Sequence, residues 1–176
     1  MIKRVKSLRP LVFEIRPSRV LPNEVSVFAV RNLKAGDLIS DVDSPEEVVW
    51  ISAQDLKKVD PITRRKVKNF CTNEEGEYCV PVDLNNMGTS WYFNHSCDAN
   101  VAYDMQGSFI AGRNIKKDEE LTLDYGRMFV DPNFKMNCLC GARNCRKIIT
   151  GKDWLKPEFR AKNIDKMWPD MRKLPK

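Results

Sequence analysis

Residues 94–100 read NHSCDAN, residues 120–126 read ELTLDYG, and residues 138–146 read CLCGARNCR. The last of these three segments places three cysteines in one short loop that contains a glycine. Thiolates at this spacing can reach one tetrahedral metal ion, and zinc in a closed structural site takes four such ligands. Cys138, Cys140 and Cys145 supply three of them, and Cys97 in the first segment is the leading candidate for the fourth.

A disulfide is the alternative for these cysteines, and the composition bears on that choice. The chain has 176 residues, which suits one domain, and 42% of them are hydrophobic and 31% charged. This composition excludes a wholly disordered, collagen-like or coiled-coil protein. No apolar run approaches the roughly 20 residues that cross a bilayer, and the first residues form no signal-type segment. We therefore expect a soluble intracellular protein without membrane contact, and a reducing compartment favours metal binding over a disulfide.

The single histidine, His95, stands next to Ser96 and Cys97. By itself this arrangement suggests a nucleophile with its base, and therefore a hydrolase. Neighbouring residues rarely present both groups in catalytic geometry, because the members of a catalytic triad normally converge from separate segments. Cys97 also cannot be a zinc ligand and a free nucleophile at once. We therefore favour a structural histidine whose ring is held by hydrogen bonds.

The net charge of +6 is unevenly distributed along the chain. Residues 1–19 hold six basic residues against one acid, and residues 134–176 hold twelve against four, so the stretch between them is acidic overall. The basic ends either make weak contact with nucleic acid or are solvated termini. The acidic middle favours the approach of a cationic peptide.

Short runs rich in Val, Ile and Phe, separated by turn-forming residues, predict β-strands throughout the chain. They lie at 11–15, 25–30, 37–40, 46–51, 77–82, 101–104, 108–112 and 120–125. Ser52 and Asp55 resemble a capping box, which predicts a helix over about 53–59 that Pro61 ends. A strongly basic stretch predicts a helix at 62–70, and Pro157 is placed to begin a last helix through about Met167. The expected fold class is mainly β with short helices.

In order and spacing, the three quoted segments resemble the successive signatures of SET-domain protein-lysine methyltransferases, the last being the cysteine-rich post-SET segment. VFAVRNLKAGDLI at 27–39 is similar to the opening strand and turn of that domain. The resemblance implies a SET-domain fold of small twisted β-sheets with a pseudoknot that brings NHSC and ELTLDY side by side. It divides the chain into a SET domain at 11–133 with core motifs at 25–126, a post-SET zinc segment at 134–150 and a helical extension at 151–176.

The resemblance also implies a reaction, namely methyl transfer from S-adenosyl-L-methionine to the lysine side chain of a histone or another protein. The expected catalytic residues are Tyr125, which matches the catalytic tyrosine, and Tyr103. Tyr103 and Leu123 also match channel positions that set the number of methyl groups, Tyr103 through its hydroxyl. We expect mono- or dimethylation rather than trimethylation. The expected cofactor contacts are Ser26, Val27, Phe28, Asn94, His95, Tyr125 and Leu139. The expected structural zinc ligands are Cys97, Cys138, Cys140 and Cys145.

Several positions depart from the family pattern. Glu24-Val25-Ser26 replaces a Gly-x-Gly sequence, Trp91 replaces an arginine and Ala99 a proline. Asp41-Val-Asp-Ser-Pro45 replaces a Glu-Tyr-x-Gly-Glu run. These departures support an alternative function, a catalytically silent SET-like module that binds a peptide or nucleoprotein.

Other residues are expected to have structural roles, or allow two readings. Cys71 and Cys79 have apolar neighbours in the sequence and are expected to be small buried hydrophobes. Glu120 and Asp124 are expected to form structural hydrogen bonds rather than act as an acid and a base. Trp154 either covers the cofactor or, like Trp168, anchors the last helix.

Overall fold

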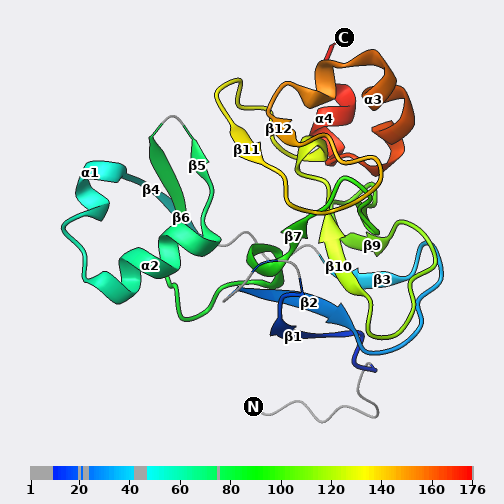
Figure 1. Cartoon of the computed structure of the whole chain (residues 1–176), viewed down its shortest axis with the longest axis horizontal. Helices are drawn as coiled ribbons and strands as arrows, with labels where there is room; N and C mark the ends of the chain where they lie inside the picture. Colours follow the sequence, from blue (N-terminus) through cyan, green and yellow to red (C-terminus); the bar gives the residue numbers. More distant parts are fainter. Residues whose placement is uncertain (1–9, 20, 22–23, 42–46, 75, 176) are drawn as a thin grey trace.

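The computed structural model describes residues 10–19, 21, 24–41, 47–74 and 76–175. Within these residues the strands form small separate sheets and the helices are short, as the β-rich prediction requires (Figure 1). In chain order the elements are β1 (Phe13–Pro17), β2 (Val25–Ala29), β3 (Leu38–Ser40), β4 (Val48–Ser52), α1 (Ala53–Leu56), α2 (Pro61–Phe70), β5 (Asn73–Glu74), β6 (Glu77–Pro81), β7 (Asn94–His95), β8 (Val101–Tyr103), β9 (Phe109–Ala111), β10 (Glu120–Leu123), β11 (Lys135–Asn137), β12 (Ile148–Thr150), α3 (Pro157–Asn163) and α4 (Pro169–Lys173).

Two features of the sequence lie outside the described residues. Residues 1–9 contain much of the basic N-terminal end, and residues 42–46 contain most of the run that departs from the family pattern and the first residue of a predicted strand. In the part of the chain that is described, no helix is both long and apolar enough to cross a membrane.

The central sheet has the strand order β1-β2-β10-β7. The β1–β2 and β2–β10 pairs are antiparallel, whereas β10 and β7 run parallel, with Thr122 opposite Asn94 and Leu123 opposite His95. Parallel neighbours need a crossover connection, and the chain between β7 and β10, which includes β8 and β9, supplies it. The NHSC and ELTLDY segments therefore lie side by side, as the resemblance predicted.

The main hydrophobic core joins the central sheet to the β3-β9-β8 sheet. Its buried members are Val27, Ala29, Leu33, Ile39, Phe93, Val101, Tyr103, Phe109, Ala111, Ile115, Leu121 and Leu123. Strand β10 alternates in the way that a sheet with one buried face requires, since Leu121 and Leu123 are buried and Glu120 and Thr122 are half-buried. The half-buried side of β10 is thereby available to line a cleft.

Asn100 is buried, and its side chain bonds to the backbone of β10 much as a neighbouring strand would. Its Nδ2 donates to the Glu120 carbonyl oxygen at 2.8 Å, and its Oδ1 accepts from the Thr122 N–H at 2.9 Å. A second donation at 3.1 Å reaches a carboxylate oxygen of Glu119. One amide side chain therefore satisfies two backbone groups and fixes the loop after β7 to β10.

A separate lobe is formed by β4, α1, α2, β5 and β6, around the buried residues Leu56, Val67 and Val80 (Figure 1). Ser52 caps α1 by accepting from the Asp55 N–H at 3.0 Å, which confirms the predicted capping box. The predicted end at Pro61 is wrong, because α1 stops at Leu56 and Pro61 begins α2. A proline suits a first helical position, where its missing N–H removes no helical hydrogen bond.

The C-terminal extension is two helices rather than the single one predicted at 157–167. α3 ends at Asn163, whose Nδ2 donates back to the Phe159 carbonyl at 2.7 Å and whose Oδ1 accepts from Arg127 Nε at 3.0 Å. A 3-10 turn follows, and Pro169 then begins α4. The Trp168 ring packs edge-on against Tyr103 at 5.2 Å, so this tryptophan anchors the extension to the core.

Replacing Asn100 with alanine is expected to lower the free energy of unfolding by about 2–4 kcal/mol, because two backbone groups of β10 lose their partner in a buried place. Asn32→Ala is the matched control, since the exposed Asn32 side chain also accepts a backbone hydrogen bond, from Lys117 at 2.8 Å. Its loss should cost under about 1 kcal/mol, because water replaces the bond. Denaturant unfolding measures both, and equal losses would contradict the assignment.

Candidate functional site

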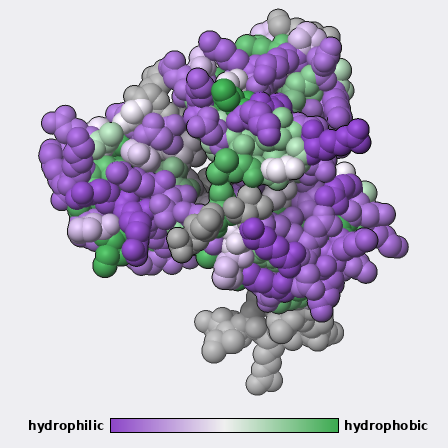
Figure 2. All heavy atoms as spheres, viewed as in Figure 1, coloured by the Kyte–Doolittle hydropathy of each residue, from purple (hydrophilic) through white to green (hydrophobic). Residues whose placement is uncertain are grey.

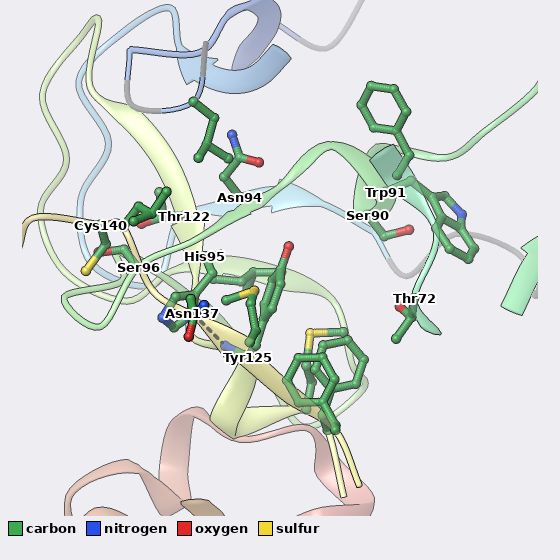
Figure 3. A pocket seen from close by; sticks show the side chains of 18 of the residues that line it. Thr72, Ser90, Trp91, Asn94, His95, Ser96, Thr122, Tyr125, Asn137 and Cys140 are labelled. Carbon is green, nitrogen blue, oxygen red and sulfur yellow. Dashed lines mark hydrogen bonds between the residues drawn. The ribbon is translucent and has the colours of Figure 1, made fainter. Parts of the chain in front are cut away.

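A cleft of about 950 Å³ lies over the junction of β7 and β10 (Figure 3). One wall comes from the separate lobe, through residues that include Phe70 and Thr72. The other comes from β11 and the cysteine-rich segment that follows it, through residues that include Met136 and Leu139. A smaller pocket of about 360 Å³ is lined by Phe70, Trp91, Asn94 and Tyr125, which also line the cleft. Tyr125 therefore contributes to two hollows, one large and one small.

Tyr125 is held in place through its hydroxyl and its backbone. The hydroxyl donates to the Phe93 carbonyl oxygen at 2.9 Å, and burial raises the pKa of Tyr125 to about 12, so the phenol stays protonated at neutral pH. Tyr125 begins a short 3-10 turn, and the Asp124 side chain caps this turn by accepting from the Gly126 N–H at 3.0 Å. A protonated hydroxyl at a fixed position can donate one hydrogen bond and offer its lone pairs to a weak C–H donor.

His95 connects Tyr125 to the cysteines. Its Nδ1 accepts from the Tyr125 N–H at 3.1 Å, which leaves the proton of the neutral ring on Nε2, 3.5 Å from Cys97 Sγ. Burial lowers the pKa of His95 to about 4, so the ring is neutral at neutral pH. Since the lone pair of Nδ1 is already used, the ring is not available as a base, which agrees with the predicted structural role of the side chain.

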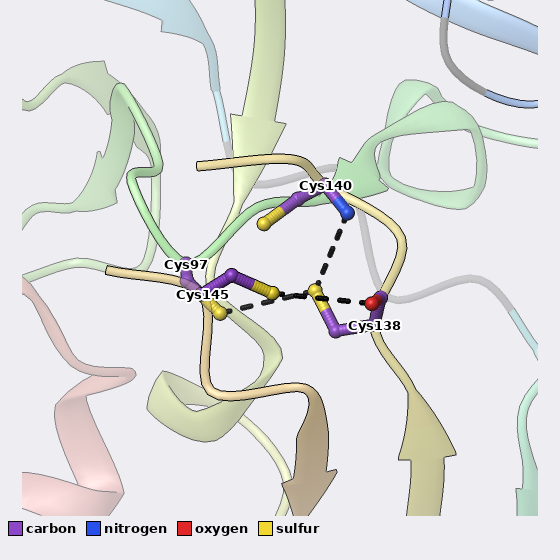
Figure 4. A group of neighbouring side chains, drawn as sticks. All are labelled: Cys97, Cys138, Cys140 and Cys145. Carbon is purple, nitrogen blue, oxygen red and sulfur yellow. Dashed lines mark hydrogen bonds between the residues drawn. The ribbon is translucent and has the colours of Figure 1, made fainter. Parts of the chain in front are cut away.

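The four predicted metal-ligating cysteines meet at one point (Figure 4). Their sulfur atoms all lie within 4.8 Å of one another, and Cys97 Sγ is 3.8 Å from Cys138 Sγ. Four sulfurs at the usual 2.3 Å from a tetrahedral zinc would be about 3.8 Å apart, so the spacing and the donor set fit this ion. The prediction that Cys97 joins the three cysteines of the distant C-terminal segment is confirmed.

Backbone N–H groups already point at the cysteine sulfurs. Cys97 Sγ accepts from the Arg146 N–H at 3.3 Å and Cys145 Sγ from the Lys147 N–H at 3.4 Å. Burial opposes ionisation of the cluster and raises the pKa of Cys97 and of Cys138. At Cys140, hydrogen bonds from the backbone and from the Cys138 and Cys145 side chains outweigh burial and lower the pKa to about 6. Such donors stabilise the thiolate form that a metal requires.

Arg146 joins the cysteine-rich segment to the rest of the molecule. Its guanidinium binds both oxygens of the buried Asp124 carboxylate, with Nη1 2.9 Å from Oδ2, and its Nε lies 3.3 Å from the buried Asp153 carboxylate. Its plane also lies over the Phe159 ring, 4.7 Å from the centroid. Asp124 thus has the structural role expected for it. Sequence reasoning missed Arg146, although it is the last residue of a quoted segment.

The predicted cofactor contacts separate into two groups. Four of the predicted cofactor contacts line the cleft, namely Asn94, His95, Tyr125 and Leu139, and so does the predicted channel residue Leu123. Ser26, Val27 and Phe28 are buried in β2, where their contact with a cofactor stays a prediction. The residues just before them, Glu24 and Val25, line the smaller pocket instead.

Tyr103 lies deeper than a channel position suggests. Its side chain is 2% exposed, burial raises its pKa, and its hydroxyl is 3.4 Å from the sulfur of Met128, which lines the cleft. Tyr103 therefore lies behind the cleft lining, where its hydroxyl contacts Met128. Its predicted catalytic role remains a prediction.

Aromatic residues that sequence reasoning missed complete the cleft. Phe129 and Phe134 line it with their rings 4.4 Å apart, and Phe129 packs edge-on against Tyr125 at 5.3 Å. Their position between the ELTLDYG and cysteine-rich segments was the available signal. Trp154 is not among the described residues that line the cleft, and Arg160 packs over its ring at 5.6 Å. This favours the anchoring role for Trp154.

Cys71 and Cys79 stand apart from the metal-ligating group. Both are half-buried rather than fully buried as expected, and Cys71 packs against the small core of the separate lobe. Burial raises the pKa of Cys71 to about 12, which makes it a poor metal ligand.

The purified protein is expected to contain one zinc ion per chain, because four thiolates converge on one point. Cys140→Ser should lower the zinc content well below one and expose residues 134–150 to faster hydrogen exchange, since metal binding stabilises the loop that supplies the ligands. Elemental analysis and hydrogen-exchange mass spectrometry measure the two effects. Cys71→Ser is the control, and equal zinc loss in both variants would contradict the site.

Comparison with known proteins agrees with this geometry. A family model described as SET domain matches residues 24–126. The chain is 40% identical over 137 residues to the protein named Histone-lysine N-methyltransferase trr of Drosophila melanogaster, covering 70% of this chain and 5% of that one. It is 45% identical over 67 residues to Histone-lysine N-methyltransferase 2D of Homo sapiens, covering 34% and 1%.

A third relative, Probable histone-lysine N-methyltransferase set-23 of Caenorhabditis briggsae, is 29% identical over 123 residues, covering 65% of this chain and 48% of its own. The chain thus spans less than half the length of these relatives. The matched family segment covers more than half of the chain and includes both β7 and β10, whose pairing forms the floor of the cleft. The chain belongs to the SET domain family.

Proposed function

We propose that the protein transfers a methyl group from S-adenosyl-L-methionine to the side-chain amine of a lysine in a protein substrate. The observation that carries the proposal is the position of Tyr125, which lines both the large cleft and the smaller pocket. A group at such a junction can contact a donor on one side and an acceptor on the other. The names of the relatives, all histone-lysine methyltransferases, support the same reaction.

The donor would supply an activated methyl group on a sulfonium, and transfer is an in-line displacement that needs a neutral amine. A free lysine has a pKa near 10.4, so its ammonium must lose a proton to solvent first. Burial in an apolar channel opposes the charged form and lowers that pKa. Five aromatic residues line the smaller pocket, namely Phe70, Trp91, Tyr92, Phe93 and Tyr125. The same lining holds Lys68, whose positive charge opposes an ammonium, and Glu24, whose carboxylate favours one.

Tyr125 would then orient the reacting groups. Its hydroxyl is fixed by the bond to the Phe93 carbonyl, and its ring by packing against Phe129. Holding nitrogen and methyl about 3–3.5 Å apart and in line supplies much of the rate without a metal or a covalent intermediate. Weak C–H···O contacts to the hydroxyl and to main-chain carbonyls would hold the methyl group in that line.

Asn94, His95 and Leu139 are the residues of this chain that we assign to donor binding. Asn94 is held by donating to the Val25 carbonyl at 3.2 Å, and His95 by the Tyr125 N–H. Leu139 is 69% exposed, between two of the clustered cysteines, and lines the cleft. An apolar side chain in that position can cover an adenine ring, and zinc binding would hold it there.

The cleft also suits a cationic substrate. Asp98, Glu119 and Glu120 line it, against Arg113 and Lys135. Together with the acidic middle of the sequence, this lining favours a lysine-rich segment such as a histone tail. The names of the relatives, which refer to histones, support an intracellular enzyme. We further propose mono- or dimethylation, through Leu123 in the cleft and Tyr103 behind Met128.

A catalytically silent module that binds a peptide is the second candidate. It is favoured by Glu24 and Trp91, which depart from the family pattern and both line the smaller pocket. An acidic side chain there changes the charge that a donor would meet. The aromatic lining and the fixed Tyr125 hydroxyl favour the enzyme.

Replacing Tyr125 with phenylalanine is expected to lower methyl transfer about 100-fold, because the reacting groups lose their orientation. The assay uses labelled donor with a panel of histones and a cell extract, and mass spectrometry of the product identifies the number of methyl groups. Tyr78→Phe is the control, because Tyr78 packs in the separate lobe away from the cleft lining. Wild-type turnover in Tyr125→Phe, or mostly trimethyl product, would contradict the corresponding proposal.

A further inference from the structure

The outer face of α2 is basic. Val67 faces the core of the separate lobe and is buried. Arg65 lies roughly opposite Val67 on the helix and Lys68 about 100° around from it, and both are exposed. Lys57 and Lys58, in the turn before the helix, are exposed as well. Figure 2 shows hydrophilic side chains over most of this lobe on the face in view.

The nearby acidic side chains are already used. The Asp55 carboxylate pairs with Lys58 at 2.7 Å. The Asp60 carboxylate caps α2 by accepting from the backbone N–H groups of Ile62 and Thr63, each at 3.0 Å. Asp55 is thus offset by Lys58. Asp60 keeps its negative charge, but at the first turn of the helix, where it forms no ion pair with Arg65 or Lys68 among the described residues.

Two other cations of α2 are structural. Arg64 Nη2 donates to the Lys57 carbonyl at 2.6 Å and to the Val59 carbonyl at 2.8 Å, and Lys66 Nζ donates to the Leu84 carbonyl at 2.6 Å. These bonds fix the preceding turn, and with it Lys57, next to the helix. Among the residues that the structure describes, Lys57, Arg65 and Lys68 form no ion pair.

We propose that Lys57, Arg65 and Lys68, the cation face, bind the phosphate backbone of double-stranded nucleic acid. A ten-residue helix is about 15 Å long and matches several phosphates, since a duplex carries one charge per roughly 1.7 Å of its axis. The Arg65 guanidinium suits a phosphate because it can bind two oxygens at once. A membrane surface is disfavoured, because an interfacial helix needs a broad exposed apolar face. In α2 Val67 is buried, and Ile62 is the only large hydrophobic side chain that is exposed.

The cation face lies next to the proposed active site. The same helix ends at Phe70, which lines the cleft, and Lys68 lines the smaller pocket. A basic substrate protein bound to the same duplex would then be held close to the cleft. This consequence rests on the proposed function, whereas duplex binding by the cation face does not.

Fluorescence anisotropy of a labelled duplex of about 20 base pairs, titrated with the full zinc-loaded chain between about 50 and 200 mM salt, tests the proposal. The double variant Lys57→Gln, Arg65→Gln should bind the duplex several-fold more weakly. The plot of log K against log salt should also become less steep, by about 2 in slope, because two phosphate contacts are lost. Lys116→Gln, Lys117→Gln is the control with the same change in net charge, made at two exposed lysines of another region. It should leave affinity and slope nearly unchanged.

Three results would overturn the proposal. The first is that the chain does not bind the duplex at about 50 mM salt, and the second is that both double variants weaken binding equally. The third is that polyglutamate or phosphatidylserine vesicles bind more tightly than the duplex. Circular dichroism melting checks that both variants fold. Titration with S-adenosyl-L-methionine separates this proposal from the proposed function, because the Lys57, Arg65 variant should keep wild-type donor affinity even where it loses the duplex.

Discussion

The parallel pairing of β7 with β10 is the constraint on which the cleft depends. It places Asn94 and His95 beside Thr122 and Leu123, although more than twenty residues separate the two strands. Because of this register, His95 Nδ1 can accept from the Tyr125 N–H, and Cys97 emerges next to the cysteine-rich segment. A shift of one residue would turn the side chains of a strand to the opposite face and separate these groups.

The second requirement is that the cysteine-rich segment stays against this junction, since it forms a wall of the cleft. Two attachments hold it, the cysteine cluster and the pairing of Arg146 with the buried Asp124 carboxylate. A buried carboxylate without its partner is costly, so the ion pair holds the segment in one position even where it adds little net stability. The ring of His95, between Tyr125 and Cys97, links the metal cluster to the tyrosine.

Local signals predicted much of this molecule. Apolar runs located the main strands, Ser52 and Asp55 located the start of α1, and the spacing of the cysteines located a metal cluster. The role of Arg146 was not predictable in this way, because its partners Asp124 and Asp153 meet only when three segments fold together. The interruption between α3 and α4 depends likewise on contacts of Asn163 with Arg127, outside the helix. Burial of Ser26 and Phe28 follows from sheet order, which no local pattern specifies.

The central claim is that the cleft binds the methyl donor and that the cysteine-rich wall is needed for it. Isothermal titration of the zinc-loaded protein with S-adenosyl-L-methionine, repeated after chelation, tests this most directly. We expect one donor to bind per chain in the zinc-loaded form and the affinity to fall strongly without zinc, because Leu139 and its loop lose their position. No detectable binding by the zinc-loaded protein, or unchanged affinity after zinc removal, would contradict it.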